Sequence, residues 1–205
     1  MSKVLVTESY LMDIGDAIRS KNGSTNQYKP SEMAGAINDI TTQGSQDNTV
    51  LNSILDRSIS GNYVNNDLTE VGDSAFSNCL QLTSATFTKA TKIDSSAFYY
   101  CISLESISLP EAKKIDEYSF AYCFSLKSVS MPKIEVLGSD GDDSGIFDYD
   151  YKMTTINIPS TIQSIGKTAF DESGITTINI DRRADSIPGA PWGATNATVN
   201  WTGTT

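Results

Sequence analysis

The pentads AFSNC (75–79), AFYYC (97–101) and SFAYC (119–123) carry one pattern three times, and their phenylalanines Phe76, Phe98 and Phe120 lie 22 residues apart. This period is typical of leucine-rich solenoids, in which each repeat forms one coil that cannot bury its apolar side alone and must stack on its neighbours. The spacing therefore predicts a stack of coils.

The residues that follow each pentad predict a short strand in every coil. The runs LESISLP (104–110), LKSVSMP (126–132) and MTTINIP (153–159) alternate apolar with small polar residues, which is the signature of a half-buried strand. Stacked coils should therefore build a parallel sheet along one face. Further copies of the pattern without cysteine surround Phe147 and Phe170, and a degraded last copy ends at Trp201.

This arrangement resembles the BspA-like leucine-rich repeats, in which the unit I-x-x-x-A-F-x-x-C-x-x-L-x-x-[IV]-x-[LI]-P recurs in bacterial surface proteins and phage structural proteins. The match covers roughly residues 68–201. The resemblance implies an α/β-type repeat solenoid, mostly strand and loop, with short parallel strands stacked on one face. It says little about function, because this repeat serves many partners.

The three cysteines Cys79, Cys101 and Cys123 occupy one equivalent position in successive repeats. We expect them to form a buried structural column of small apolar side chains, since cysteine is among the most buried residue types. A zinc site requires four convergent ligands, and the chain has no histidine.

The repeat spacing changes once, because Phe120 and Phe147 are 27 residues apart. The extra residues lie in an acidic insertion at 137–150, LGSDGDDSGIFDYD. Its spacing partly matches a calcium loop, although a tyrosine stands where a bidentate glutamate is expected. The candidate ligands for weak calcium binding are Asp140, Asp142, Ser144 and Asp148. The alternative is a solvated acidic bulge. Apart from this calcium we expect no cofactor.

Two exposed surfaces are candidate binding sites. Tyrosine gives a large, rigid contact area with a polar tip, so the aromatic residues near the pentads predict a recognition surface on the side opposite the strands: Tyr99, Tyr100, Tyr118, Tyr122, Phe124, Tyr149 and Tyr151. The outward strand positions offer hydroxyls and amides for a glycan or a polypeptide, although such residues also simply suit an exposed sheet: Ser106, Ser108, Ser128, Ser130, Thr155, Asn157, Thr177 and Asn179.

The first 41 residues differ from the repeats. TESYLMDIGDAIRSKNG (7–23) and KPSEMAGAINDI (29–40) each place apolar residues at helical spacing, which predicts a helical hairpin that anchors or oligomerises the chain. A hairpin of this size cannot hold a core alone and should dock on a partner or on its own copies. We therefore expect a homo-oligomer.

This segment also resembles a short amino-terminal module of tail, fibre and other virion proteins of phages that infect Gram-positive bacteria. The resemblance is carried by the patterns L-x-x-I-x-x-A-I-R-x-K-x-G from Leu11 to Gly23 and Y-x-P-x-E-M-A-x-A-I from Tyr28 to Ile37. It implies that residues 1–41 contact other virion proteins and that the protein belongs to a virion.

The remaining segments complete the domain organisation. A polar linker at 42–48 and an amino-terminal cap at 49–67, with an amphipathic turn or two at its start, precede the solenoid at 68–205. The tryptophans Trp192 and Trp201 are expected to close the other end, because a solenoid needs capping repeats.

Composition excludes several classes of function. With 15 basic against 25 acidic side chains the net charge is −10, which argues against nucleic acid binding. The first residues show no secretory signal and no later run is long and apolar enough to cross a membrane, so we expect synthesis in a host cytoplasm. No catalytic motif is present, and the adjacent acids Asp116 and Glu117 are of a kind usually solvated, so we predict a non-enzyme.

These observations lead to one functional hypothesis and two alternatives. The hypothesis is a phage virion structural protein, associated with a tail, baseplate or fibre, whose solenoid binds the host surface through a glycan or a protein. The first alternative is a spacer or capsid decoration protein that contacts other virion proteins. A bacterial surface adhesin is disfavoured by the missing export signal.

Overall fold

The computed structural model describes residues 57–138 and 145–204. The chain divides into two units, 1–55 and 56–205, and the second unit is the solenoid. The predicted hairpin at 1–41, the linker at 42–48 and the first part of the predicted cap, 49–56, lie outside the described residues.

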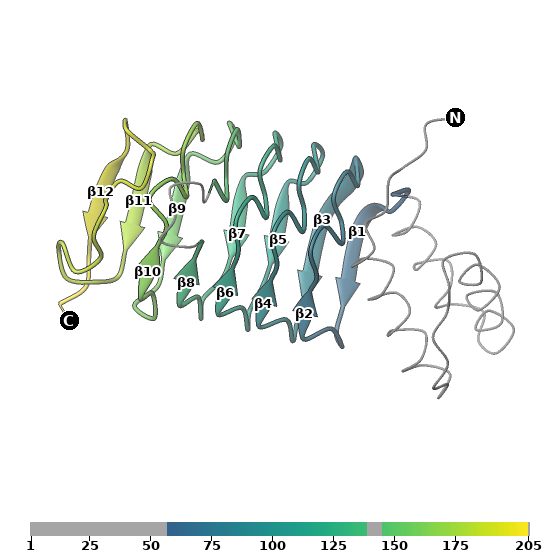
Figure 1. Cartoon of the computed structure of the whole chain (residues 1–205), viewed down its shortest axis with the longest axis horizontal. Helices are drawn as coiled ribbons and strands as arrows, with labels where there is room; N and C mark the ends of the chain where they lie inside the picture. The colour runs from purple at the N-terminus through teal and green to yellow at the C-terminus, as the bar shows by residue number, and fades with distance from the viewer. Residues whose placement is uncertain (1–56, 139–144, 205) are drawn as a thin grey trace, which may run out of the picture. The chain divides into compact units, whose positions relative to one another are not determined.

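The predicted parallel sheet is confirmed, and it forms one face of the solenoid (Figure 1). Apart from the exposed Val64 of the first strand, the apolar residues of the strands face inward and the polar ones between them face outward, as in the buried Ile156 and Ile158 beside the exposed Asn157. The face consists of two sheets, one of β1 (Ser60–Asn65), β3 (Gln81–Phe87), β5 (Ser106–Ser108) and β7 (Ser128–Ser130), the other of β9 (Thr155–Ile158), β11 (Thr177–Ile180) and β12 (Thr198–Trp201).

A second ladder of two-residue parallel strands forms another face, which the sequence did not predict. Two residues are too few to show an alternating pattern, although the second residue of each pair is buried in the core. The strands are β2 (Glu70–Val71), β4 (Lys92–Ile93), β6 (Lys114–Ile115), β8 (Val136–Leu137) and β10 (Ser164–Ile165).

The pentads form the turns of the third face and bond from coil to coil. Phe76 donates its backbone N–H to the Ala97 carbonyl at 2.7 Å, and Phe98 repeats the bond to the Ser119 carbonyl at 2.7 Å. No helix occurs among residues 57–138 and 145–204, so the α/β-type part of the expectation is not seen there. The reason is local, because left-handed residues such as Ser96 and Tyr100 flank or interrupt each pentad, and a right-handed helix cannot pass through them.

The core is a column of stacked phenylalanines, one from each of five successive coils, all at the same position of the pentad turn. All five are buried, and successive ring centroids lie 5.1, 5.4, 5.5 and 5.9 Å apart along Phe76, Phe98, Phe120, Phe147 and Phe170. Trp192 is fully buried and packs against Phe170 at 6.2 Å, and Trp201 packs on Trp192 at 6.1 Å. The tryptophans therefore cover the end of the column, where the sequence placed a cap.

The described part of the predicted amino-terminal cap is a strand. β1 pairs in parallel with β3, and its inward Tyr63 contacts Phe76 and Phe87 with centroids 5.1 and 5.6 Å apart. The first strand of the sheet thus begins inside the segment 49–67 that was assigned to the cap.

Candidate binding surfaces

The three cysteines lie buried as free thiols at one position of successive coils. The thiol of Cys101 donates to the Phe76 carbonyl at 3.0 Å, and that of Cys123 donates to the Phe98 carbonyl at 3.2 Å. Burial raises the pKa of Cys123 well above its ordinary value, so this thiol stays neutral. The column therefore joins neighbouring coils through thiol–carbonyl hydrogen bonds.

Asp150 continues the cysteine column in the next coil, which sequence reasoning missed. Its Oδ1 accepts a hydrogen bond from the Cys123 backbone N–H at 2.8 Å, while its buried Oδ2 has no partner in the structure. Burial raises the pKa of Asp150 well above its ordinary value. The signal was present in the sequence, since Asp150 stands three residues after Phe147, as Cys123 stands after Phe120.

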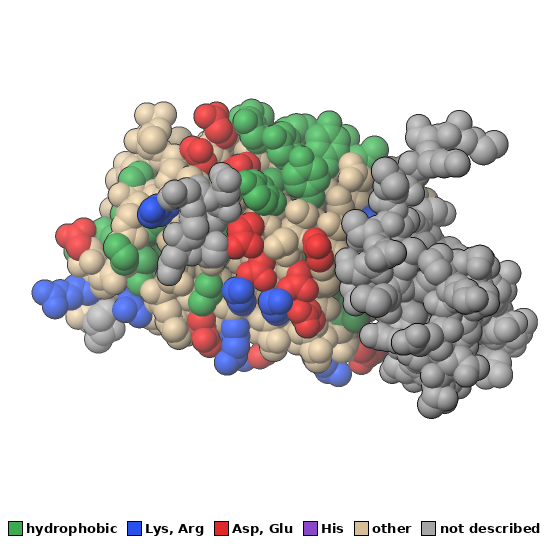
Figure 2. Space-filling model, in the orientation of Figure 1, with side chains coloured by type: hydrophobic (Ala, Val, Ile, Leu, Met, Phe, Trp, Pro, Cys, Tyr) green, Lys and Arg blue, Asp and Glu red, His purple; other side chains and the backbone are tan. Residues whose placement is uncertain are grey.

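Six of the predicted aromatic residues come together along the pentad turns, where Figure 2 shows hydrophobic side chains gathered on one rim of the solenoid. Tyr122 stacks on Tyr149 with centroids 4.6 Å apart, and Phe124 lies parallel to Tyr151 at 6.2 Å. We call this group the aromatic stripe: Tyr99, Tyr100, Tyr122, Phe124, Tyr149 and Tyr151. Tyr122 thus contacts the rings of both Tyr99 and Tyr149, so part of its surface is covered within the stripe.

The stripe continues toward the amino terminus with aliphatic side chains that the sequence analysis did not single out. Leu80 and Ile102 hold the place that Phe124 and Tyr151 hold in later coils, one residue after the cysteine column. Leu80 is 43% exposed, and Tyr151 is 57% exposed. An apolar surface that crosses several coils in this way is a feature of interaction sites.

Three tyrosines of the stripe stand on left-handed backbone. Tyr100, Tyr122 and Tyr149 have φ of 60°, 64° and 63°, in a region that disfavours bulky side chains and suits Gly or Asn. Asn78 fills the same place in the first pentad with φ 60°. The fold accepts Asn at this position, so the tyrosines are present despite a conformational cost.

The aromatic stripe ends beside acidic residues. In the coil after Tyr149 its position is taken by Glu172, which is exposed and preceded by Asp171. The neighbouring Tyr122, together with burial and the charge of Glu172, raises the pKa of Tyr149, so its hydroxyl stays protonated. In the same coil as Glu172, Gly174 takes the position that Tyr151 has in the previous coil. A Cβ on Gly174 would lie 2.2 Å from the Tyr151 carbonyl oxygen.

Tyr118 stands at the opposite end of its pentad turn from Tyr122 of the aromatic stripe. It lies at the entry of its turn, at the left-handed position that Ser74 and Ser96 hold in the previous coils. Three residues lie between it and Tyr122 along the chain. The sequence grouped it with the stripe because it adjoins a pentad.

The outward strand residues form ladders between coils, which brings the predicted polar face together. In the carboxyl-terminal coils the ladder is made of amides, since Asn179 donates to Asn157 at 2.9 Å and Asn200 donates to Asn179 at 2.9 Å. In the first coils Ser84 donates to the Asn62 amide oxygen at 2.8 Å. The remaining candidates lie on the same face in register: Ser106 with Ser128, Ser108 with Ser130, and Thr155 with Thr177.

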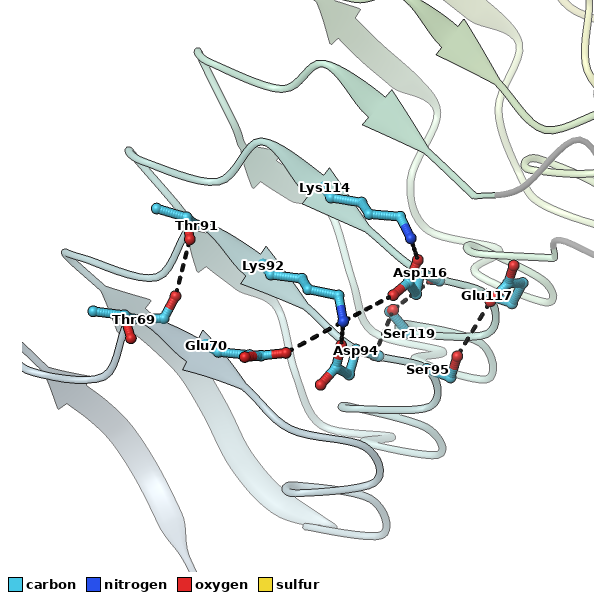
Figure 3. Close-up of polar contacts among 10 residues, drawn as sticks. All are labelled: Thr69, Glu70, Thr91, Lys92, Asp94, Ser95, Lys114, Asp116, Glu117 and Ser119. Carbon is cyan, nitrogen blue, oxygen red and sulfur yellow. Dashed lines mark hydrogen bonds and ion pairs between the residues drawn. The ribbon is translucent and has the colours of Figure 1, made fainter. Parts of the chain in front are cut away.

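Charged residues form a second set of ladders, over the two-residue strands (Figure 3). Lys92 pairs with Asp94, with Glu70 at 3.2 Å and with Asp116 at 3.6 Å, while Lys114 pairs with Asp116 at 2.6 Å. The hydrogen bond to Asp94 is the largest cause of a raised pKa at Lys92. Asp116 is buried and paired, so the expectation of a solvated acid was wrong for this residue.

The acidic insertion is only partly described. Of the candidate calcium ligands, Asp148 is half-buried in the pentad turn, and Asp140, Asp142 and Ser144 lie outside the described residues. Among the residues described, no cluster of three or more carboxylates and thiols is placed to hold a metal ion. Weak calcium binding stays a prediction, and a titration calorimetry experiment at millimolar calcium that gives no heat would contradict it.

The residues with a described structure include no helix with the length and apolar character of a membrane span.

Comparison with known families and structures identifies the repeats. Residues 56–141 and 143–191 match the family model described as BspA type leucine rich repeat region, in six copies. No curated protein sequence matches the chain.

Three solved leucine-rich repeat structures are similar in fold. The leucine rich repeat protein of T. pallidum is 23% identical with a TM-score of 0.54, and the match covers 66% of this chain and 63% of that protein. A leucine rich cell surface protein of Faecalibacterium prausnitzii is 23% identical (TM-score 0.36; 58% and 47% covered), and a leucine-rich repeat protein of Bacteroides ovatus is 17% identical (0.29; 62% and 52%). The chain thus spans less than two thirds of these proteins.

Proposed function

The chain belongs to the BspA-type leucine-rich repeat family, and from this premise we propose that its solenoid binds a protein partner through the aromatic stripe without catalysing a reaction. The observation that carries the proposal is the set of three tyrosines on left-handed backbone. Asn78 shows that Asn is sufficient for the fold at this position in the first pentad. Tyr has a higher conformational cost on left-handed backbone, so its presence there points to a role in binding.

The chemistry of the stripe favours a polypeptide over a sugar. Tyr122 and Tyr149 stack on each other, so one face of each ring is covered while the ring edges stay available for contact. Apolar side chains of a protein partner can pack along such edges, and tyrosine is enriched at protein interfaces for this reason. The acidic residues Asp171 and Glu172 at the end of the stripe suit a Lys or Arg on the partner.

We place this recognition on a phage virion that infects Gram-positive bacteria. The support is the resemblance of residues 11–37 to amino-terminal modules of virion proteins, which would attach the solenoid to other virion proteins as a homo-oligomer. The solenoid would then project to the host cell. An antibody raised against the chain should label particles released by the host.

The test is binding of the fluorescently labelled full chain to candidate Gram-positive cells, before and after protease treatment of the cells. We expect saturable binding that protease removes. Tyr122→Asn should weaken it at least tenfold, because the central ring of the stripe is lost while the backbone conformation is retained. Tyr118→Asn is the matched control, with the same change on left-handed backbone outside the stripe.

Equal loss of binding in both variants would contradict a role for the stripe. No binding to cells that the parent phage adsorbs to would favour the alternative, a spacer or capsid decoration protein whose contacts lie within the virion. The partner would then be sought among virion proteins, with the same two variants.

A further inference from the structure

The strand face is interrupted at one step. β7 and β9 are neighbours, yet no strand pairing joins them within residues 57–138 and 145–204, so the face consists of two sheets (Figure 1). The step lies between the two coils that the acidic insertion connects. On the other two faces the same step keeps its bonds, from Gln163 N–H to the Glu135 carbonyl and from Tyr122 N–H to the Asp148 carbonyl, both at 2.7 Å.

The interruption leaves backbone groups without their usual partners. One step earlier, Leu109 donates its N–H to the Ser130 carbonyl at 2.8 Å. The corresponding bond, from Met131 N–H to the Asn157 carbonyl, is missing from the backbone hydrogen bonds of the described coils. These two backbone groups therefore lack the partner that the earlier steps of the sheet provide.

A groove of about 500 Å³ runs over this interruption, and residues of four successive coils line it. Its apolar part includes Met131, Pro132 and Pro159, and its polar part includes Asn157, Asn179 and Asp181. The mixture of a few polar groups with an apolar surface is typical of ligand sites.

The amide ladder keeps half of its hydrogen-bonding capacity. Asn179 gives one N–H to Asn157 and accepts one from Asn200, while an amide offers two N–H groups and two acceptor sites. One donor and one acceptor of Asn179 thus remain. Because both ladder bonds fix the amide plane, these groups are preorganised for a ligand.

The lining selects the class of ligand. No Lys or Arg is among the described residues that line the groove, and Asp181 adds a carboxylate, so an anionic polymer is disfavoured. An extended peptide along the coils would rise about 3.3 Å per residue against a coil spacing of about 4.8 Å, and its groups would lose register. Sugar hydroxyls, which both donate and accept, meet these amides and backbone groups without such a constraint.

We infer that this groove binds a neutral oligosaccharide. Its hydroxyls pair with Asn157, Asn179 and Asp181, and the C–H face of a sugar ring packs on Pro132 and Pro159. The site is separate from the aromatic stripe, and the inference does not depend on the proposed protein partner.

The test begins with the labelled full chain on an array of neutral and anionic glycans, followed by titration calorimetry with the tetrasaccharide form of the strongest neutral ligand. We expect binding to neutral glycans alone. Asp181→Asn, which preserves shape, and Asn179→Leu, which breaks the ladder, should each weaken binding at least tenfold. Ser108→Leu is the matched control, because Ser108 holds the strand position of Asn179 in a coil that does not line the groove.

Circular dichroism confirms folding of each variant, and Asp181→Asn keeps the test valid if Asn179→Leu does not fold. No neutral glycan bound on the array, preference for anionic glycans, or equal weakening by Ser108→Leu would overturn the inference. Tyr122→Asn should leave glycan affinity unchanged. A failure of the glycan inference can therefore be distinguished from a failure of the protein-partner proposal.

Discussion

Asp150 occupies a position that cysteine fills in the three earlier repeats, and the substitution puts a carboxyl group into the core. Burial raises its pKa well above the ordinary value, so between that value and its raised pKa the folded chain keeps a proton that the unfolded chain releases. The stability contribution is therefore complete at low pH and is lost as the pH rises through this window. Neighbouring groups are Asp148 and the neutral thiol of Cys123.

The first prediction follows at this residue. Asp150→Asn keeps the oxygen that accepts from the Cys123 N–H and removes the titrating group. The melting temperature of the variant should therefore be higher than that of the natural chain, and the difference should grow as the pH rises from 4 toward 7. Thermal unfolding followed by circular dichroism at a series of pH values measures this. Parallel pH profiles for the two chains would show that Asp150 is not the source of the dependence.

A second residue-scale prediction concerns Cys101, whose thiol donates to the Phe76 carbonyl inside the column. Cys101→Ser places a more polar hydroxyl in an apolar site and should cost about 1–2 kcal/mol of unfolding free energy. Binding to cells should persist, because the thiol lies beneath the surface. Unchanged stability with lost binding would contradict a structural role.

At the scale of the element, each pentad turn buries one phenylalanine ring in the core. Phe120→Ala removes the middle of the phenylalanine column and should cost about 3–5 kcal/mol, measured by chemical denaturation. Lys127→Ala in the same coil is the control and should leave stability unchanged within error, because its pair with Glu105 is solvent-exposed. Similar losses in the two variants would mean that the column does not dominate the core.

Prediction from sequence succeeded where one residue type recurs at a fixed period. The spacing of Phe76, Phe98 and Phe120 sufficed for the solenoid, and the alternation in LESISLP sufficed for its strands. The two-residue ladder was missed because a pair such as Lys92–Ile93 carries no alternation. The sequence predicted the residues of the aromatic stripe. The separate position of Tyr118 and the aliphatic continuation of the stripe at Leu80 followed only from the geometry of the coils.

The groove was beyond prediction for a different reason. It depends on the loss of pairing between β7 and β9, and the sequences of these strands match the neighbouring repeats in pattern. Nothing local in Ser128–Ser130 or Thr155–Ile158 indicates an interrupted sheet. The position of Asp150 in the cysteine column was accessible, because its distance from Phe147 is the one that the cysteines keep.

For the solenoid as a whole, stability is shared between neighbouring coils, and the ends need not unfold with the middle. The chain has two tryptophans, Trp192 and Trp201, so its fluorescence reports on the last coil. Gly193 has φ +93°, and a Cβ there would lie 2.7 Å from the Asp171 backbone nitrogen. Gly193→Ala should destabilise this coil by about 1–3 kcal/mol.

The expected result is a fluorescence midpoint that falls further than the midpoint by far-ultraviolet circular dichroism, which averages over all coils. Gly72→Ala is the control, since a Cβ at Gly72 meets no atom within 4 Å. If both midpoints fall together in Gly193→Ala, the solenoid unfolds as one cooperative unit.

The acid–lysine ladders also make the coils unequal. Asp67 faces Lys89 in the next coil at 3.4 Å, and Glu111 faces Lys133 at 2.7 Å, each 22 residues on. Removing one whole repeat, 88–109, would keep every strand and phenylalanine in register but would bring Asp67 opposite Glu111. The loss of this coil would therefore replace an attraction at the junction by a repulsion between two exposed carboxylates.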